Sequence, residues 1–111
     1  MNQSNFVQLI GHLGKDVELF KKEDSKAVGK VTLATTKRYK NTKGEQVTLT
    51  EWHTLVMFGG VAEIAEKYLK KGSHVLVTGS LKTRKYTTKE AVDKYITEIV
   101  VDDILFLDRK D

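Results

Sequence analysis

Nine consecutive residues decide the fold of this chain: Thr50-Glu51-Trp52-His53-Thr54-Leu55-Val56-Met57-Phe58. The run is rich in β-branched and aromatic residues, which predicts a β-strand. Successive side chains of a strand point to opposite faces, so Trp52 and Phe58 share one face while Leu55 and Met57 share the other. The strand therefore carries large apolar groups on both sides.

Only one face of this strand can belong to the core of a soluble domain, so the other face must meet a partner. The chain has a net charge of +4, from 19 basic and 15 acidic residues. Flat aromatic rings beside lysine and arginine are typical of surfaces that bind single-stranded nucleic acid. We therefore expect the face with Trp52 and Phe58 to bind such a strand.

The composition predicts one domain over residues 1–111. A chain of 111 residues that is 40% hydrophobic can fill one compact core and is too short for two. Cysteine is absent, which removes disulfides and thiolate metal sites and fits the reducing cytoplasm. The N-terminus is polar, and no apolar run approaches the roughly 18 residues that span a bilayer. We expect a cytoplasmic protein without a metal or a cofactor.

The basic residues gather in two clusters, and each cluster encloses a tyrosine, Tyr39 in the first and Tyr86 in the second. The basic members are Lys37, Arg38, Lys40 and Lys43 in the first cluster and Lys82, Arg84, Lys85 and Lys89 in the second. One charged run is as easily a solvated loop as a binding site. Two runs that each hold an aromatic residue favour nucleic-acid binding.

Alternating apolar residues predict five strands, at 6–13, 28–35, 47–58, 74–86 and 95–107. Glycines inside these patterns, such as Gly11 and Gly79, indicate bends or close backbone contacts, which a small closed barrel needs. With one helix between the third and fourth strands, this order predicts an all-β fold, the five-stranded Greek-key barrel of the OB-fold. Such barrels commonly bind oligonucleotides over the second and third strands and through the 1–2 and 4–5 loops.

Apolar residues at helical spacing predict that one helix, and they are Val61, Ile64, Ala65, Tyr68 and Leu69. Lys70 and Lys71 suit the negative end of the helix dipole, and Gly72 suits the left-handed residue that ends many helices. We expect Tyr68 and Leu69 to lie in the core and not on a binding surface.

Several short segments, taken in their order and spacing, resemble one known family. They are Leu9-Ile10-Gly11-His12-Leu13-Gly14-Lys15-Asp16, Leu33-Ala34-Thr35, Thr50-Glu51-Trp52-His53, Tyr68-Leu69-Lys70-Lys71-Gly72-Ser73, Leu81-Lys82-Thr83-Arg84-Lys85-Tyr86 and Thr97-Glu98-Ile99. The chain resembles the bacterial single-stranded DNA-binding proteins over nearly its whole length. The resemblance implies a nucleoid-associated protein that coats single-stranded DNA during replication, recombination and repair.

The resemblance implies that four aromatic residues stack against bases: Tyr39, Trp52, Phe58 and Tyr86. Arg84, Lys85 and Lys71 match basic positions of the family, while Lys37, Arg38, Lys40 and Lys43 are added from charge position alone. The two tyrosines stand where many relatives have tryptophan, so each offers a smaller stacking face. Thr54 and Gly60 stand where relatives often carry a basic side chain, so some phosphate contacts are expected to be missing.

The family usually assembles as a homotetramer, and a homodimer is the alternative expected here. The position that matches His53 lies at a subunit contact in the family, whereas the residues alone predict a buried histidine with a hydrogen-bond partner. Relatives continue into a flexible tail whose acidic tip recruits replication enzymes. This chain ends at residues 107–111, as a shortened or naturally tail-less version would, so we do not expect recruitment of that kind. The segment 102–106 resembles such a tip but continues the last strand pattern.

Three other functions compete with this interpretation. An enzyme would need catalytic spacing, but the three histidines are scattered, Glu51 and His53 favour a structural pair, and the glycines form no phosphate loop. An OB-fold module for protein contacts, as in a primosome, is a stronger rival, although the aromatic set argues against it. An RNA-binding module is also open, because stacking alone does not separate RNA from DNA.

Overall fold

The computed structural model describes residues 4–21 and 26–108. In chain order its elements are β1 (Val7–Leu13), β2 (Glu18–Phe20), β3 (Val28–Lys40), β4 (Gln46–Phe58), α1 (Gly60–Tyr68), β5 (His74–Thr87) and β6 (Asp93–Phe106). The long strands match the five predicted ones, and the helix lies between β4 and β5 as expected. The short β2, which pairs with β3, was not predicted because three residues are too few for an alternating pattern.

The strands form one curved sheet in the order β1-β5-β6-β4-β3-β2, and an additional pairing between β1 and β3 closes it into a barrel. All pairings are antiparallel except β4 with β6, which is parallel. The architecture is the predicted OB-fold. A Cβ on Gly11 would overlap the carbonyl of Ala34, and one on Gly79 would overlap that of Val100, so both glycines mark the close backbone contacts that closure requires.

The core lies inside the barrel and under α1. Val31, Leu33, Leu55, Met57, Val75 and Val77 are its largest fully buried side chains. The prediction that one face of the segment 50–58 is core is therefore confirmed by Leu55 and Met57. Leu69 is buried as predicted, but Tyr68 is 61% exposed, so its assignment to the core was wrong. The helix is short and buries mainly Ala62 and Ala65, which turns the Tyr68 side of the predicted apolar face toward solvent.

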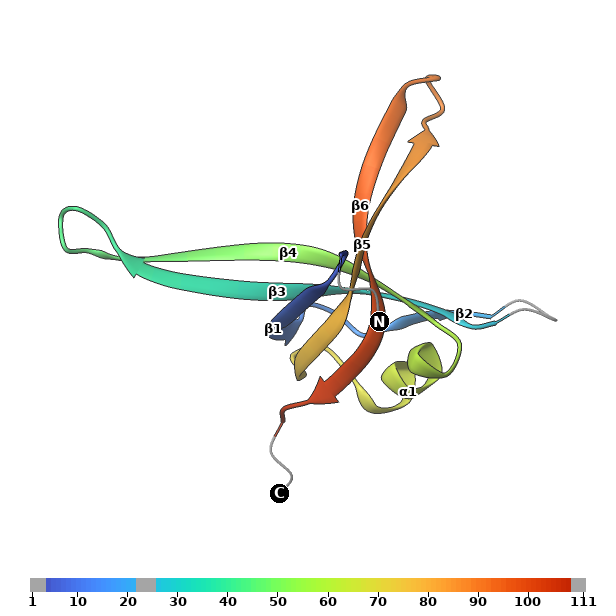
Figure 1. Cartoon of the computed structure of the whole chain (residues 1–111), viewed down its shortest axis with the longest axis horizontal. Coiled ribbons are helices and arrows are strands. Elements are labelled where there is room, and N and C mark those ends of the chain that lie inside the picture. The colour runs from blue at the N-terminus through green and yellow to red at the C-terminus, as the bar shows by residue number, and fades with distance from the viewer. Residues whose placement is uncertain (1–3, 22–25, 109–111) are drawn as a thin grey trace.

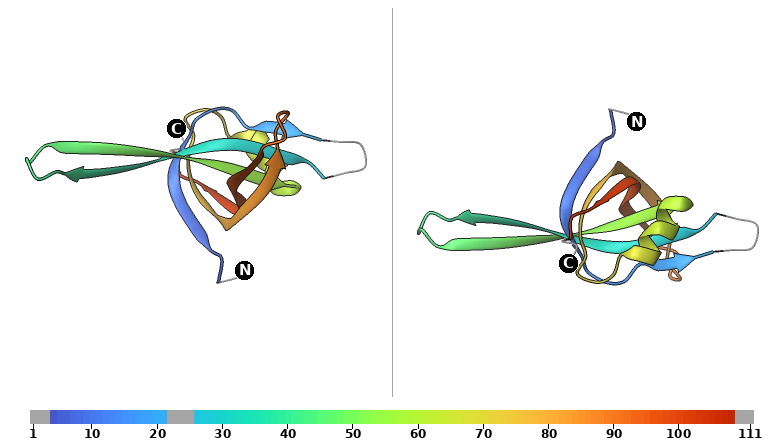
Figure 2. Two further views of the ribbon diagram at one scale, coloured as in Figure 1. Left: turned by 90° about the horizontal axis from the view of Figure 1, so that it is seen from above. Right: turned by 90° about the horizontal axis from the view of Figure 1, so that it is seen from below.

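Two hairpins extend well beyond the barrel, and we call them the β3–β4 finger and the β5–β6 finger (Figure 1). The β3–β4 pairing continues without interruption from Val28 and Phe58 to Lys40 and Gln46. The β5–β6 pairing reaches Thr87 and Asp93. Strand β3 extends to Lys40, beyond the predicted end at residue 35, because its outer part is exposed on both faces and lacks the alternation of a half-buried strand. The other long strands begin and end within two residues of the predicted limits. In the views from above and below, the β3–β4 finger extends far to one side of the barrel (Figure 2).

The segment 102–106 belongs to β6, which runs from Asp93 to Phe106. Its residues pair with β5, for example Ile104 with Val77 and Phe106 with Val75. The prediction that this acidic-apolar segment is a strand is confirmed.

Candidate nucleic-acid interface

One outer face of the barrel is built from alternate residues of four adjacent strands. Across this face Lys30 on β3 pairs with Val56 on β4, Val56 with Val100 on β6, and Val100 with Ser80 on β5. Paired residues of neighbouring strands point to the same side of a sheet. The face that holds Trp52 and Phe58 is therefore continuous from β3 to β5.

Trp52 presents its indole on this face and is 61% exposed. A Cβ on Gly14 would overlap the six-membered ring of Trp52 and would lie 2.8 Å from Thr32 Oγ1. The missing side chain at Gly14 therefore leaves the space that the ring occupies. The main chain holds Gly14 in place, because its N–H donates to the Thr32 carbonyl over 2.9 Å. The edge of the indole is thus set against Gly14 while most of the side chain stays exposed, which leaves ring surface for a base to stack on.

Phe58 lies beside a groove of about 220 Å³ on the same face. The groove is lined by Val28, Lys30, Val56, Phe58, Lys82, Arg84, Glu98 and Val100. Its floor is aliphatic, one wall is aromatic and its cationic side chains come from β3 and β5 on opposite sides. A groove with these features offers an apolar surface for a base and amines for phosphates.

A buried acid holds the arginine of this groove. Arg84 Nε donates to Glu98 Oε1 over 2.9 Å, and the Glu98 side chain is 7% exposed. The hydrogen bond to Glu98, followed by the charge of Glu98, raises the pKa of Arg84 above its ordinary value. Arg84 is therefore a permanently charged but already paired donor, held close to the groove.

The β5–β6 finger places Tyr86 on the same face of the ribbon as Arg84, two residues farther along β5. Lys85 points to the opposite face, where its Nζ lies 3.1 Å from Asp93 Oδ2. Tyr95, which pairs with Lys85, is 71% exposed on that opposite face. The predicted set thus has Arg84 and Tyr86 together and Lys85 apart from them.

The β3–β4 finger carries the first basic cluster. Tyr39 and Lys37 alternate with Arg38 and Lys40, so the cluster covers both faces of the ribbon. By the same alternation Tyr39 faces away from Trp52, since Trp52 pairs with Ala34. Lys43 lies in the tip, where the Asn41 carboxamide oxygen accepts the Lys43 and Glu45 N–H groups at 2.9 Å.

Two other predicted residues lie outside this face. Lys71 follows the helix, and its N–H donates to Asp16 Oδ1 over 2.7 Å. His53 is half-buried on the core-side face of β4, and its Nε2 lies 2.9 Å from Thr35 Oγ1. The predicted hydrogen-bond partner is thus present, but the ring is half-buried and not buried, and no hydrogen bond joins it to Glu51 among the described contacts.

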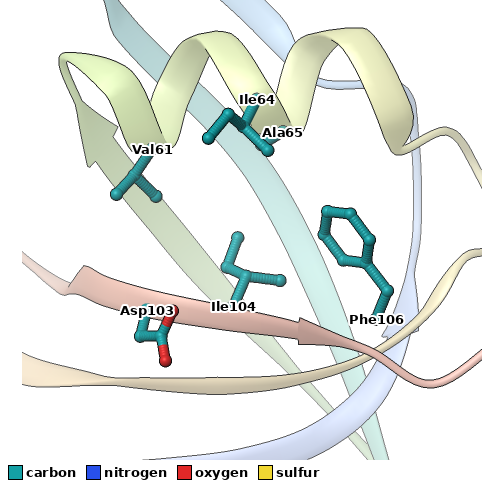
Figure 3. Close-up of a pocket in the computed structure, with 6 residues that line it drawn as sticks. All are labelled: Val61, Ile64, Ala65, Asp103, Ile104 and Phe106. Carbon is teal, nitrogen blue, oxygen red and sulfur yellow. The ribbon is translucent and has the colours of Figure 1, made fainter.

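A second hollow lies between α1 and β6 and is lined by the residues drawn in Figure 3. It measures about 70 Å³, and Asp103 is the only charged residue in its lining. Tyr68 approaches Phe106 at its edge, with ring centroids 6.4 Å apart. The hollow has room for the end of one side chain and is much smaller than a usual ligand pocket of roughly 300 Å³ or more.

In the described part of the chain, no group of three or more histidine, cysteine or acidic residues is arranged to hold a metal ion. No helix within residues 4–21 and 26–108 is long and apolar enough to cross a membrane.

Sequence reasoning did not identify three contributors to this face: Gly14, Lys30 and Glu98. Glycine in a loop carries no chemical signal of its own, and only the fold brings Gly14 under Trp52. Lys30 stands alone in an apolar strand, and Glu98 is the acid opposite Lys82 in the register. The alternation of β3 and β6 could have indicated that both point outward with Trp52 and Phe58.

The fold and this face together define an oligonucleotide-binding barrel of the OB class. The chain matches the model of the Single-strand binding protein family over residues 4–107, and it belongs to that family. It is also similar to a solved structure from Plasmodium falciparum, described as an SSB complex with ssDNA. The identity is 34% and the TM-score is 0.87, over 97% of this chain and 100% of the other.

Proposed function

We propose that this protein binds single-stranded DNA without sequence preference and protects it during replication, recombination and repair. The observation that carries the proposal is the continuous outer face on which Trp52, Phe58 and a cation-lined groove lie together. Membership of the single-strand binding family supports the same reading. So does the similarity to the Plasmodium falciparum structure described as an SSB complex with ssDNA.

The physical basis is stacking combined with phosphate neutralisation. A base stacked on an aromatic ring contributes about 1–3 kcal/mol, a range known from proteins of this class. Every base has a π-face, so stacking tolerates any sequence, and a duplex hides those faces. Exposed aromatic rings therefore favour single strands over duplex, while lysines and arginines follow the backbone.

The proposed contacts comprise the four aromatic residues and the basic residues predicted with them. They are Tyr39, Trp52, Phe58, Tyr86, Arg84, Lys85, Lys71, Lys37, Arg38, Lys40 and Lys43. Tyr39 and Lys71 lie off the face of Trp52, so a strand that reaches them must wrap around the barrel or the finger. Arg84 and Lys85 already share their charge with Glu98 and Asp93, so they contribute hydrogen bonds more than net charge.

The protein is proposed to act by binding and not by catalysis, in accord with a family of DNA-binding proteins. Residues 1–111 are proposed to work as one binding unit, at the exposed DNA of the cytoplasmic nucleoid. Coating a strand in this way removes hairpins and limits access of nucleases.

The test is quenching of Trp52, the only tryptophan, by poly(dT) across a salt series. Duplex DNA and a matched RNA serve as competitors. We expect strong quenching that weakens with salt and that duplex does not compete away. Absence of binding at low salt would overturn the proposal and favour a protein-interaction module. Equal competition by the RNA would overturn the assignment to DNA.

We also propose that the chain assembles as a homotetramer, with a homodimer as the alternative, through a contact that includes His53. The half-buried ring of His53 beside Thr35 supports this, because such a ring can be covered further by a second copy. His53→Lys would place a charge in that contact, so we expect a smaller mass by light scattering. Glu66→Lys, on the exposed surface of α1, is the control. An unchanged mass for His53→Lys would contradict the proposed contact.

A further inference from the structure

The groove beside Phe58 contains two cations that the predicted set left out. Arg84 is paired with Glu98 at 2.9 Å, and Lys85 is paired with Asp93 at 3.1 Å. Lys30 and Lys82 also line or flank this region, and neither has an ion-pair partner among the described residues. The uncompensated positive charge of the groove therefore resides on these two lysines.

The register places the two lysines on opposite walls. Lys30 is on β3, and Lys82 is on β5, where it pairs with Glu98 of β6. Strands β4 and β6 lie between them, so the two residues are separated by three strand spacings, roughly 14 Å across the sheet, and Lys82 lies two residues farther along β5 than Ser80, which is level with Lys30. The two amines thus flank an apolar floor formed by Val56 and Val100.

The charges of the groove determine where a phosphate can lie. Glu98 lines the groove, is 5% exposed and is neutralised by Arg84 at 2.9 Å, so this pair attracts no phosphate to the floor. Lys82 is exposed and Lys30 is half-buried, so the unpaired positive charge lies on the two strands that flank the floor. Phosphates are therefore directed to the walls, and the base is left to occupy the apolar floor against Phe58.

We propose that this groove is a nucleotide subsite in which Lys30 and Lys82 form a clamp on the phosphates that flank one base. The inference rests on the proposed binding of single-stranded DNA and extends it to two residues. The volume of about 220 Å³ suits one base on the floor. Phe58 supplies the stacking face, and Arg84 with Glu98 forms a neutral wall.

The experiment measures binding of oligo(dT) by Trp52 quenching across a salt series for Lys30→Gln, Lys82→Gln and the double variant. For single strands, each phosphate neutralised contributes about 0.7 to the slope of log K against log salt. Each substitution should flatten the slope by about 0.7 and weaken binding about fivefold at 0.1 M salt, and the double variant about 25-fold. Lys67→Gln, the same change on the exposed surface of α1, should leave the slope unchanged.

The outcomes separate this inference from the proposed function. If the parent protein does not bind oligo(dT), the proposed function fails. If the parent binds and Lys30→Gln and Lys82→Gln both behave like Lys67→Gln, the clamp is overturned. It is also overturned if Lys30→Gln, Lys82→Gln and Lys67→Gln lose affinity equally. Lys30→Arg and Lys82→Arg should retain the parental slope, because they keep the charge. Melting temperatures equal to that of the parent show that the variants are folded.

Discussion

The two fingers are both strand-turn-strand hairpins, but they differ in how many of their charged side chains form ion pairs. Side chains cross-link the β5–β6 finger: Thr83 and Thr97 hydroxyls lie 2.9 Å apart, Arg84 binds Glu98, and Lys85 pairs with Asp93. In the β3–β4 finger, the described cations have no ion-pair partner, and its turn is closed by Asn41. Ion pairs thus hold two cations of the β5–β6 finger, Arg84 and Lys85, whereas all the described cations of the β3–β4 finger remain unpaired.

This difference predicts that the two fingers contribute differently to the affinity for a nucleic-acid strand. A cation without a partner has a counterion to release when a phosphate arrives, so it contributes affinity that falls with salt. A cation that is paired with a carboxylate has already released its counterion. The β3–β4 finger should therefore supply more of the salt-dependent affinity than the β5–β6 finger, where Arg84 and Lys85 are already paired.

The largest effect on DNA affinity is expected when the unpaired cations of the β3–β4 finger are removed. When all its basic residues are replaced by glutamine, the slope of log K against log salt should flatten by up to about 3. The affinity at 0.1 M salt should fall by roughly 100-fold or more. The four positions are Lys37, Arg38, Lys40 and Lys43. All four are exposed, so the melting temperature should not change. A parental slope measured with oligo(dT) would show that this finger does not meet the strand.

The next largest effect is expected at the aromatic platform between the fingers. Trp52→Ala should weaken binding by about 1–3 kcal/mol, or roughly 5- to 150-fold, with little change in stability. The measurement uses anisotropy of a dye-labelled oligo(dT), since the variant lacks its tryptophan. Tyr68→Ala is the matched control, because Tyr68 is also 61% exposed but lies on α1. Equal losses of affinity in Trp52→Ala and Tyr68→Ala would mean that bases do not stack on Trp52.

A smaller effect is expected from the glycine under that platform. In Gly14→Ala the new methyl group must displace the Trp52 ring, so we expect a shifted emission maximum and binding weakened by roughly threefold to tenfold. The loss is smaller than for Trp52→Ala because a displaced indole still offers a π-face. Gly60→Ala is the control, since a Cβ there has nothing within 4 Å. Unchanged emission and affinity would show that the ring is not positioned by Gly14.

The smallest effect is expected from the paired charges of the β5–β6 finger. The double variant Lys85→Gln/Asp93→Asn removes a pair whose members are both about half exposed and leaves the net charge unchanged. Surface pairs of this kind contribute about 0–1 kcal/mol to stability. Both the salt slope and the melting temperature should stay close to those of the parent. A slope that falls by about 0.7 would show that Lys85 leaves Asp93 to bind a phosphate.

Residues were predictable where local spacing decides their role, and were missed or misplaced where contacts across the fold decide it. Trp52 and Phe58 were identified because strand alternation puts them opposite Leu55 and Met57, which the structure buries. Tyr68 was assigned to the core because helical spacing does not tell how wide a face a short helix buries. Gly14 was missed because its role depends on a ring 38 positions away in the sequence.

The sequence by itself determined the class of fold and the presence of an outward aromatic face, because alternation, turn residues and the order of elements are local signals. It also located both basic clusters. Only the tertiary structure decided which cations are free, because Arg84 meets Glu98 and Lys85 meets Asp93 through the register of β5 and β6. Whether two charged side chains pair depends on the distance between neighbouring strands of the sheet. The spacing of residues along one strand does not determine that distance.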